Sequence, residues 1–329
     1  MGQQNTIAII ENCRYCLMCR HVCPVGHVTR KETMTPHGWG LTIASVQRGL
    51  LTWNPETVDV LYSCADCGTC RAFCVTDQAL PDAIAATRAE VAGRGLAPAA
   101  ALEIHQAIQE WSNPYEKKKP DVAKGKGEVA LFVGDDAKYL WPEGLDAALK
   151  LLAAVGVKPI LIGTGRCNGY LPSSLGFPDT ARELAQATLS ELKASGAKRL
   201  LVLTPGDQYA FSRLLTERLG IEWPEGVELR EVISLLEEKS AEGRLKFKPR
   251  LTSGHTRILT PPIHCEFQRA IPRRAICWRA SCPALGGSYS GARSAATRAG
   301  TARFNSPARI FPLTWPIRAW RMRNRQAHR

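Results

Sequence analysis

The chain reads Cys13-Arg14-Tyr15-Cys16-Leu17-Met18-Cys19-Arg20-His21-Val22-Cys23-Pro24 near its start, and Cys64-Ala65-Asp66-Cys67-Gly68-Thr69-Cys70-Arg71-Ala72-Phe73-Cys74 about forty residues later. Both runs follow the pattern C-x2-C-x2-C-x3-C. This is the bacterial [4Fe–4S] spacing, in which the fourth cysteine of each run ligates the other cluster. Three closely spaced thiolates can cap three corners of one cube, whereas the fourth points away along the next turn. The spacing therefore predicts two [4Fe–4S] clusters.

The expected ligands fall into two crossed sets. The first cluster takes Cys13, Cys16, Cys19 and Cys74, and the second takes Cys64, Cys67, Cys70 and Cys23. With crossed ligation, each cluster would cross-link the two halves of the domain. Structural zinc usually uses pairs of C-x2-C with four ligands per metal, which fits two four-cysteine runs poorly. Disulfides need an oxidising compartment, and no signal peptide is evident. Zinc, disulfides and mixed occupancy remain the alternatives.

Charge is distributed unevenly along the 329 residues. The net charge is +13, but residues 249–329 hold fifteen arginines, no lysine and one acid, Glu266. The preceding 248 residues carry 28 basic and 29 acidic side chains and are therefore nearly neutral. A domain-wide basic footprint for nucleic acid is absent, so no nucleic-acid partner is expected. No apolar run approaches the length of a transmembrane segment, so we expect a cytoplasmic protein.

The pattern of the chain predicts an α+β multidomain fold. A helical dicluster ferredoxin-like domain is expected over residues 1–112, followed by a charged linker at 113–127 that contains Pro and Gly. From residue 128 to 250, strands alternate with helices, which predicts an α/β domain with a parallel sheet covered on both faces. Ligands of such sheets bind beyond the carboxyl ends of the strands. The loops expected there are 163–176 and 204–207.

The individual elements are expected as follows. Helices are predicted over residues 41–51, 54–64, 81–94, 98–111, 143–155, 179–195, 208–219 and 231–239, and strands over 129–133, 158–162, 198–203 and 227–230. Asn54 is expected as an N-cap with Pro55 at the first helical position, and Asp179 as a second N-cap.

A helical two-cluster domain followed by an α/β domain resembles the iron–sulfur subunits related to heterodisulfide reductase. This group includes the iron–sulfur subunits of glycolate oxidase, anaerobic glycerol-3-phosphate dehydrogenase and lactate-utilisation systems. The resemblance covers about residues 8–250. It implies an electron-transfer subunit that works with a flavoprotein dehydrogenase and passes electrons to a quinone or another carrier. It also implies peripheral membrane association through a partner.

The α/β part departs from that family in its cysteine-rich repeat. The family usually has Cys-Cys-Gly after the second strand, where this chain reads Cys167-Asn168-Gly169. After the third strand it reads Thr204-Pro205-Gly206-Asp207, without cysteine. Cys167 alone cannot hold the noncubane cluster known from heterodisulfide reductase. We therefore expect a degenerate repeat in which Cys167 is a plain buried or loop thiol.

The segment after about Ser253 does not resemble the family. Lysine and acid usage stop together near this point, and residues 251–329 form a basic, Arg-rich tail. We hypothesise that the tail is out of frame or disordered. Cys265, Cys277 and Cys282 have no regular ligand spacing and are not assigned to metal.

These features predict a two-cluster electron-transfer subunit of an oxidoreductase rather than a stand-alone enzyme, with no catalytic residue assigned. One alternative is a thiol–disulfide reductase subunit of the heterodisulfide type, against which the missing cysteines count. Another is a non-catalytic iron–sulfur protein with a binding or sensory role.

Overall fold

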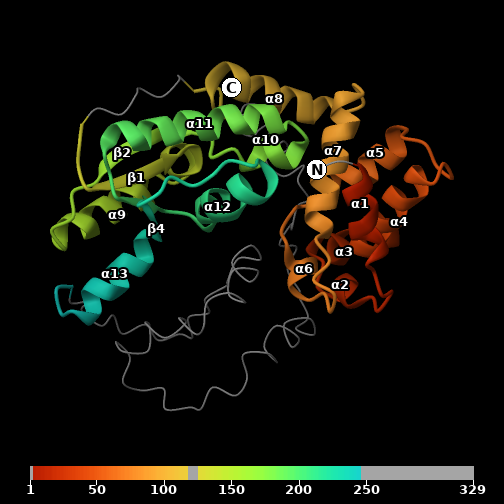
Figure 1. Cartoon of the computed structure of the whole chain (residues 1–329), viewed down its shortest axis with the longest axis horizontal. Coiled ribbons are helices and arrows are strands. Elements are labelled where there is room, and N and C mark those ends of the chain that lie inside the picture. Colours follow the sequence, from red (N-terminus) through yellow and green to blue (C-terminus); the bar gives the residue numbers. More distant parts are fainter. Residues whose placement is uncertain (1–2, 118–124, 246–329) are drawn as a thin grey trace, which may run out of the picture.

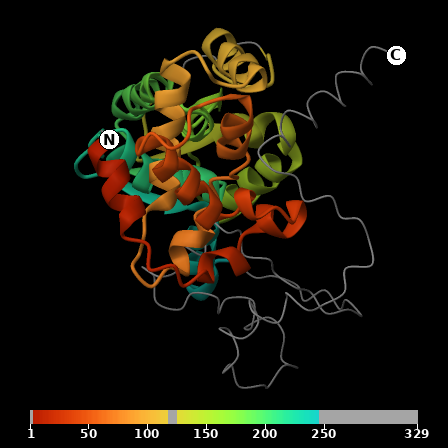
Figure 2. The ribbon, with the colours of Figure 1, turned by 90° about the vertical axis from the view of Figure 1, so that its right-hand side faces the viewer.

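The computed structural model describes residues 3–117 and 125–245, which form a helical region (residues 3–111) and an α/β region (residues 129–241). The two regions lie side by side, and α10 (Tyr170–Leu175) of the α/β region contacts α7 (Leu80–Gly93) and α8 (Ala99–Trp111) of the helical region (Figure 1). In Figure 2 the helical region faces the viewer, with the α/β region behind it. The expected combination of helices with a parallel sheet is confirmed. The ferredoxin-like character of the helical region stays a prediction, as do the domain boundaries.

The helical region consists of short helices that surround the two cysteine runs. They are α1 (Gln3–Glu11), α2 (Met18–His21), α3 (Pro24–Thr29), η1 (Glu32–Met34), α4 (Pro36–Gln47), α5 (Pro55–Tyr62), α6 (Thr69–Ala72), α7 (Leu80–Gly93) and α8 (Ala99–Trp111). Their common core includes Trp39, Ile43, Leu61, Ile84 and Val91. Cys23 and Cys64 belong to the same core, so both runs are anchored in it.

Local signals explain where two of these helices begin. Asn54 caps α5 as predicted, because its side chain accepts the N–H of Thr57 while the Thr57 hydroxyl accepts the N–H of Asn54. The predicted start of α4 at residue 41 was wrong. Thr35 accepts the N–H of Gly38 at 3.3 Å and Pro36 occupies the first turn, so the helix begins five residues earlier.

The α/β region contains four strands and the helices that cover them. The strands are β1 (Val129–Gly134), β2 (Ile160–Arg166), β3 (Arg199–Val202) and β4 (Glu228–Glu231). The helices are η2 (Asp136–Leu140), α9 (Pro142–Ala154), α10 (Tyr170–Leu175), α11 (Pro178–Ser195), α12 (Pro205–Tyr209), η3 (Ala210–Arg218) and α13 (Val232–Ala241).

All strand pairs are parallel, in the order β2-β1-β3-β4. Alternate residues of β1 face opposite sides of the sheet. Phe132 packs with residues of α11 and η3, whereas Leu131 and Val133 pack with residues of α9 and α13. Both faces are therefore covered by helices, as expected of a parallel sheet.

Three predictions for this region were wrong in detail. Strand β2 continues to Arg166, through residues assigned to a loop, because its pairing with β1 resumes at Gly134 and Arg166 after an irregularity. Asp179 lies within the first turn of α11 and does not cap it. The helix predicted over residues 208–219 begins at Pro205 and has π-type geometry from Ala210 onward.

Part of the chain lies outside the described residues. This part includes residues 118–124 of the expected linker and the whole tail, with Cys265, Cys277 and Cys282. Within the described ranges, no helix is long and apolar enough to cross a membrane.

Candidate iron–sulfur site

The two cysteine runs have the same backbone shape. In each run the residues on either side of the second cysteine have positive φ: Tyr15 (54°) and Leu17 (57°) in the first, Asp66 (47°) and Gly68 (72°) in the second. Only Gly68 is a glycine, so the other three adopt a conformation that L-residues rarely use. Such left-handed turns direct successive N–H groups into a concavity that suits anionic groups, including iron–sulfur centres.

A short helix follows each turn and leads to the fourth cysteine. Helix α2 carries Cys19 and ends two residues before Cys23, and α6 carries Cys70 and ends two residues before Cys74. The two helices lie against each other in the structure (Figure 1). Their contact brings the end of each run next to the start of the other.

Backbone amides donate hydrogen bonds to three of the sulfurs. The bonds run at 3.4 Å from Tyr15 to Cys13, from Gly26 to Cys23 and from Asp66 to Cys64. Tyr15 and Asp66 occupy equivalent positions in their runs, so the same bond recurs in both loops. Hydrogen bonds of this kind favour the charged thiolate, which is the form that binds metal.

The cysteines of the two runs lie close enough to raise one another's pKa values. Burial raises the pKa of Cys19 to about 11, and the neighbouring sulfurs that raise it further are Cys13, Cys16 and Cys74. Burial also raises the pKa of Cys70 well above its usual value, with further contributions from Cys64, Cys67, Cys19 and Cys23. The third cysteine of each run therefore lies near the fourth cysteine of the other run, and Cys19 also lies near Cys70. The expected sets are called here the first group (Cys13, Cys16, Cys19 and Cys74) and the second group (Cys64, Cys67, Cys70 and Cys23), and their role as ligands stays a prediction.

The donor set fits [4Fe–4S] chemistry. All nine cysteines of the described residues carry free thiols, and eight of them belong to the two groups. A [4Fe–4S] cluster is held by four thiolates, and each group supplies four. Within the described ranges, no three Cys, His, Asp or Glu side chains form a group that could hold a single metal ion. Neighbouring thiolates repel one another, and a cationic centre bound to each group would relieve this repulsion.

The two groups differ in their exposure. Cys16 is exposed in the first group, next to Tyr15, which has 65% of its surface exposed. Val75, directly after Cys74, is 72% exposed. In the second group, by contrast, Cys64 and Cys23 are buried. The first group therefore lies near the surface, whereas the second lies deeper in the molecule.

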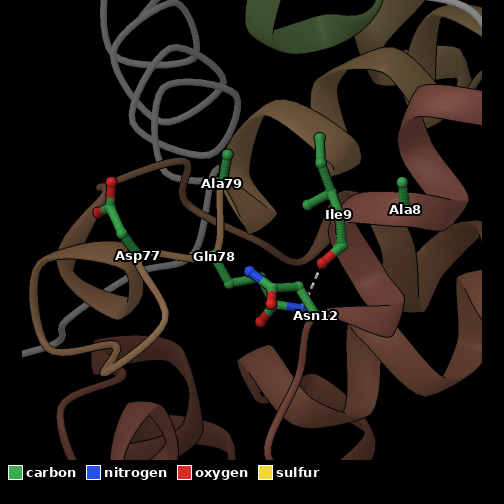
Figure 3. A pocket seen from close by; sticks show the side chains of 6 residues that line it. All are labelled: Ala8, Ile9, Asn12, Asp77, Gln78 and Ala79. Carbon is green, nitrogen blue, oxygen red and sulfur yellow. Dashed lines mark hydrogen bonds between the residues drawn. The ribbon is translucent and has the colours of Figure 1, made fainter.

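A surface hollow adjoins the first group. It has a volume of about 420 Å³ and lies between α1 and the segment after Cys74 (Figure 3). Its lining consists of Ala8, Ile9, Asn12, Asp77, Gln78 and Ala79. The Gln78 amide donates to the carbonyl oxygens of Ile9 and Ile10, and the Asn12 amide donates to that of Thr76. These bonds tie α1 to the end of the second run.

Two arginines connect the second cysteine run to its surroundings. Arg88 is fully buried and donates to the carbonyl oxygens of Leu61 and Cys64. Arg218, from η3, forms a bidentate ion pair with Asp66. No role was expected for either arginine or for Asp66. The only signal for Asp66 was its position between two cysteines.

Two buried acids lie at the carboxyl ends of the strands. Asp207, after β3, accepts hydrogen bonds from Asn168 at 2.8 Å and from Thr204 at 2.7 Å. Burial raises the pKa of Asp207 to about 6, although both hydrogen bonds act in the opposite direction. Asp135, after β1, is also buried, and burial together with the charges of Asp136 and Asp207 raises its pKa.

Cys167 lies at the same edge of the sheet and is 3% exposed. Its backbone N–H donates to the carbonyl oxygen of Ser112 at 2.9 Å. Burial, followed by the charge of Asp135, raises the pKa of its thiol well above the usual value. The thiol is therefore protonated at neutral pH and a poor nucleophile.

Comparison with known proteins agrees with this site. A family of 4Fe-4S dicluster domains matches residues 9–77, the span of both cysteine runs. One subunit of the dihydromethanophenazine:CoB–CoM heterodisulfide reductase from Methanosarcina mazei is 28% identical over 185 residues, which are 51% of this chain and 45% of that relative. Its counterpart from Methanosarcina barkeri is 26% identical over 165 residues, 46% of this chain and 40% of its own length. No solved structure matches the chain.

The matched domain and its cysteines define an iron–sulfur protein of the 4Fe-4S class. The chain is an iron–sulfur protein related to heterodisulfide reductase, as the order of its parts predicted. It spans less than half the length of the curated relatives that it matches.

Proposed function

We propose that this chain is an electron-transfer subunit with two [4Fe–4S] clusters. The observation that carries the proposal is that two cysteine runs of the same backbone shape lie against each other through α2 and α6, within the matched 4Fe-4S dicluster domain. Cys13, Cys16, Cys19 and Cys74 would hold one cluster, and Cys64, Cys67, Cys70 and Cys23 the other. A bound [4Fe–4S] cluster takes up and releases single electrons.

The residues of the chain would then set the properties of this relay. Amide hydrogen bonds to Cys13, Cys23 and Cys64 stabilise negative charge on the sulfurs and favour the reduced form of each cluster. The exposed surface around Cys16 offers a route for exchange with an outside partner, because electrons reach a centre near the surface more readily than a covered one. The first cluster would face the partner and the second would lie behind it.

The partner is proposed from the resemblance. A flavoprotein dehydrogenase would supply electrons from a substrate such as a 2-hydroxy acid, and a quinone or another carrier would accept them. The two matched relatives are subunits of a reductase complex, which supports an assembly with further subunits. The thiol–disulfide reductase alternative gains no support from Cys167, because that thiol is buried and protonated.

The decisive test measures iron and acid-labile sulfide in anaerobically purified full-length protein, followed by EPR after reduction with dithionite. We expect about eight irons and eight sulfides per chain, together with reducible signals. A Cys67→Ala variant should lose about half of the iron, whereas Cys167→Ala serves as a matched control and should keep all of it. Zinc without sulfide in the wild-type protein would refute the proposal.

The partner needs a separate experiment in the native host. A tagged chain should co-purify with a protein whose flavin is visible by absorbance, and adding the substrate of that flavoprotein should reduce the clusters. If the clusters remain oxidised while the flavin is reduced, the proposed direction of electron transfer is wrong.

A further inference from the structure

Residues of the α/β region bind the turn between Cys64 and Cys67. We propose that Arg218 and Tyr170 are positioning residues that set the reduction potential of the cluster held by the second cysteine group. The α/β region would thereby control how readily this cluster accepts an electron. The inference rests on the proposed function, because it requires that the second group holds a cluster.

The contact between Arg218 and Asp66 is a buried ion pair. The guanidinium of Arg218 donates to both carboxylate oxygens of Asp66, at 2.8 and 3.0 Å. The side chains are only 6% and 3% exposed. Asp66 stands directly before the ligand Cys67 and two residues after the ligand Cys64. Its charge is therefore close to the second cluster, and Arg218 forms an ion pair with it.

Arg218 is shared with a second carboxylate. Its Nε donates to Asp82 at 2.6 Å, and Asp82 also pairs with Arg71, the residue after Cys70. Arg71 also pairs with Asp77 and Glu217, and Glu217 pairs with Arg213, so arginines and carboxylates alternate through this network. Removing one arginine would leave a net negative charge in a poorly solvated place, where charges interact more strongly than in water.

Tyr170 fixes the backbone of the same turn. Its hydroxyl donates to the carbonyl oxygen of Asp66 at 2.6 Å. The Asp66 N–H in turn donates to the Cys64 sulfur at 3.4 Å, and Asp66 has φ of 47°. The α/β region therefore holds both the side chain and the carbonyl of the residue whose amide contacts the sulfur. Residues of α10 and η3 therefore influence the charge and hydrogen bonding around the second cysteine group.

The physical consequence follows from charge. Reduction adds negative charge to a cluster, so an unpaired carboxylate nearby disfavours the reduced form and lowers the potential. Neutralising Asp66 has the opposite effect. The first cysteine group has no such contact with Arg218, so its potential should not respond.

The test is a potentiometric titration of the full-length holoprotein followed by EPR. In Arg218→Gln we expect the midpoint of the second cluster to fall, with a change on the order of tenfold in the equilibrium constant of reduction. This is the effect of one unit charge at about 12 Å where the effective dielectric constant is about 20. A tenfold change corresponds to about 59 mV for one electron. Asp66→Asn should raise the same midpoint, and asparagine tolerates the left-handed φ at this position.

Three further variants separate charge from structure. The double variant Asp66→Asn/Arg218→Gln should return the midpoint close to that of the wild type, and Arg218→Lys should stay close to it. Tyr170→Phe should shift the same midpoint by a smaller amount. Arg199→Gln, in β3, is the matched control, because this arginine pairs with Glu228 instead of the cysteine turn, and it should change neither midpoint.

The outcomes distinguish this inference from the proposed function. If the wild-type protein holds no clusters, the proposed function fails first. If Arg218→Gln and Asp66→Asn shift the midpoint in the same direction, or leave it unchanged with about eight irons retained, the inference is wrong. If Arg218→Gln alone loses iron, the other two variants decide the question. The inference then requires that Asp66→Asn raises the midpoint of the second cluster and that the double variant has a midpoint close to that of the wild type.

Discussion

Replacing Arg88 by methionine should destabilise the protein strongly. Arg88 is fully buried on α7 and donates to three backbone carbonyl oxygens: Leu61 at 2.9 Å, Cys64 at 2.7 Å and Ser174 at 2.9 Å. Its guanidinium also lies 5.0 Å from the centre of the Tyr62 ring. One side chain therefore joins α5, the second cysteine run and α10.

The magnitude can be worked from these bonds. A hydrogen bond to a charged group contributes about 1.5–3 kcal/mol, and a buried carbonyl left without a donor costs about 1–3 kcal/mol. Methionine keeps the bulk of the side chain and supplies no donor. We expect a loss of about 3–5 kcal/mol, the range observed when one partner of a buried charged contact is removed. For a protein of this size, that corresponds to a fall of about 10 °C in the melting temperature.

The assay is thermal unfolding of the holoprotein, followed in parallel by far-UV circular dichroism and by cluster absorbance. The matched control is Arg94→Met, just after the end of the same helix, because Arg94 is an exposed arginine paired with Glu90. That variant should change stability by less than about 0.5 kcal/mol. If Arg88→Met and Arg94→Met lowered the melting temperature equally, the buried carbonyl contacts would not stabilise the fold as argued.

Three further predictions concern single positions. Asp207→Asn should stabilise the protein increasingly as pH rises. The pKa of Asp207 in the folded protein, about 6, lies above its unfolded value, so ionisation of Asp207 destabilises the wild type. In urea unfolding, the difference in the free energy of unfolding between variant and wild type should therefore grow by about 1.5 kcal/mol from pH 5 to pH 8. A pH-independent difference would contradict this. Gly176→Ala should lower the melting temperature markedly, because Gly176 has a φ of 94° and an added Cβ would lie 2.5 Å from the carbonyl oxygen of Arg88. Gly196→Ala should be destabilised less, because open space surrounds that position and only the strain of the positive φ applies. Asn54→Ala should cost about 1 kcal/mol in urea unfolding through loss of the cap of α5, and an unchanged midpoint would show that the cap is dispensable.

Sequence patterns predicted most of the elements of the α/β region. Apolar runs and helix-ending glycines located its four strands and longer helices, because local hydrophobic periodicity follows burial on a covered sheet. They failed where tertiary pairing prevailed over local signals. Gly163 and Gly165 looked like a loop, yet β2 passes through them, because pairing with β1 resumes at Arg166. Helix η3 has π-type geometry that no local pattern announced.

For the candidate site, the sequence alone determined the chemistry. The spacing of the eight cysteines specifies thiolate donors in two runs, and it does so because ligand geometry around a cluster restricts the intervening chain. Tertiary structure decided everything that depends on residues distant in sequence. It placed Arg218, 152 residues away from Asp66, against the second run, and left Cys16 of the first run exposed. The physical reason is that charge pairing and burial arise only when separate elements pack together, so no local pattern encodes which group of cysteines is covered and which faces solvent.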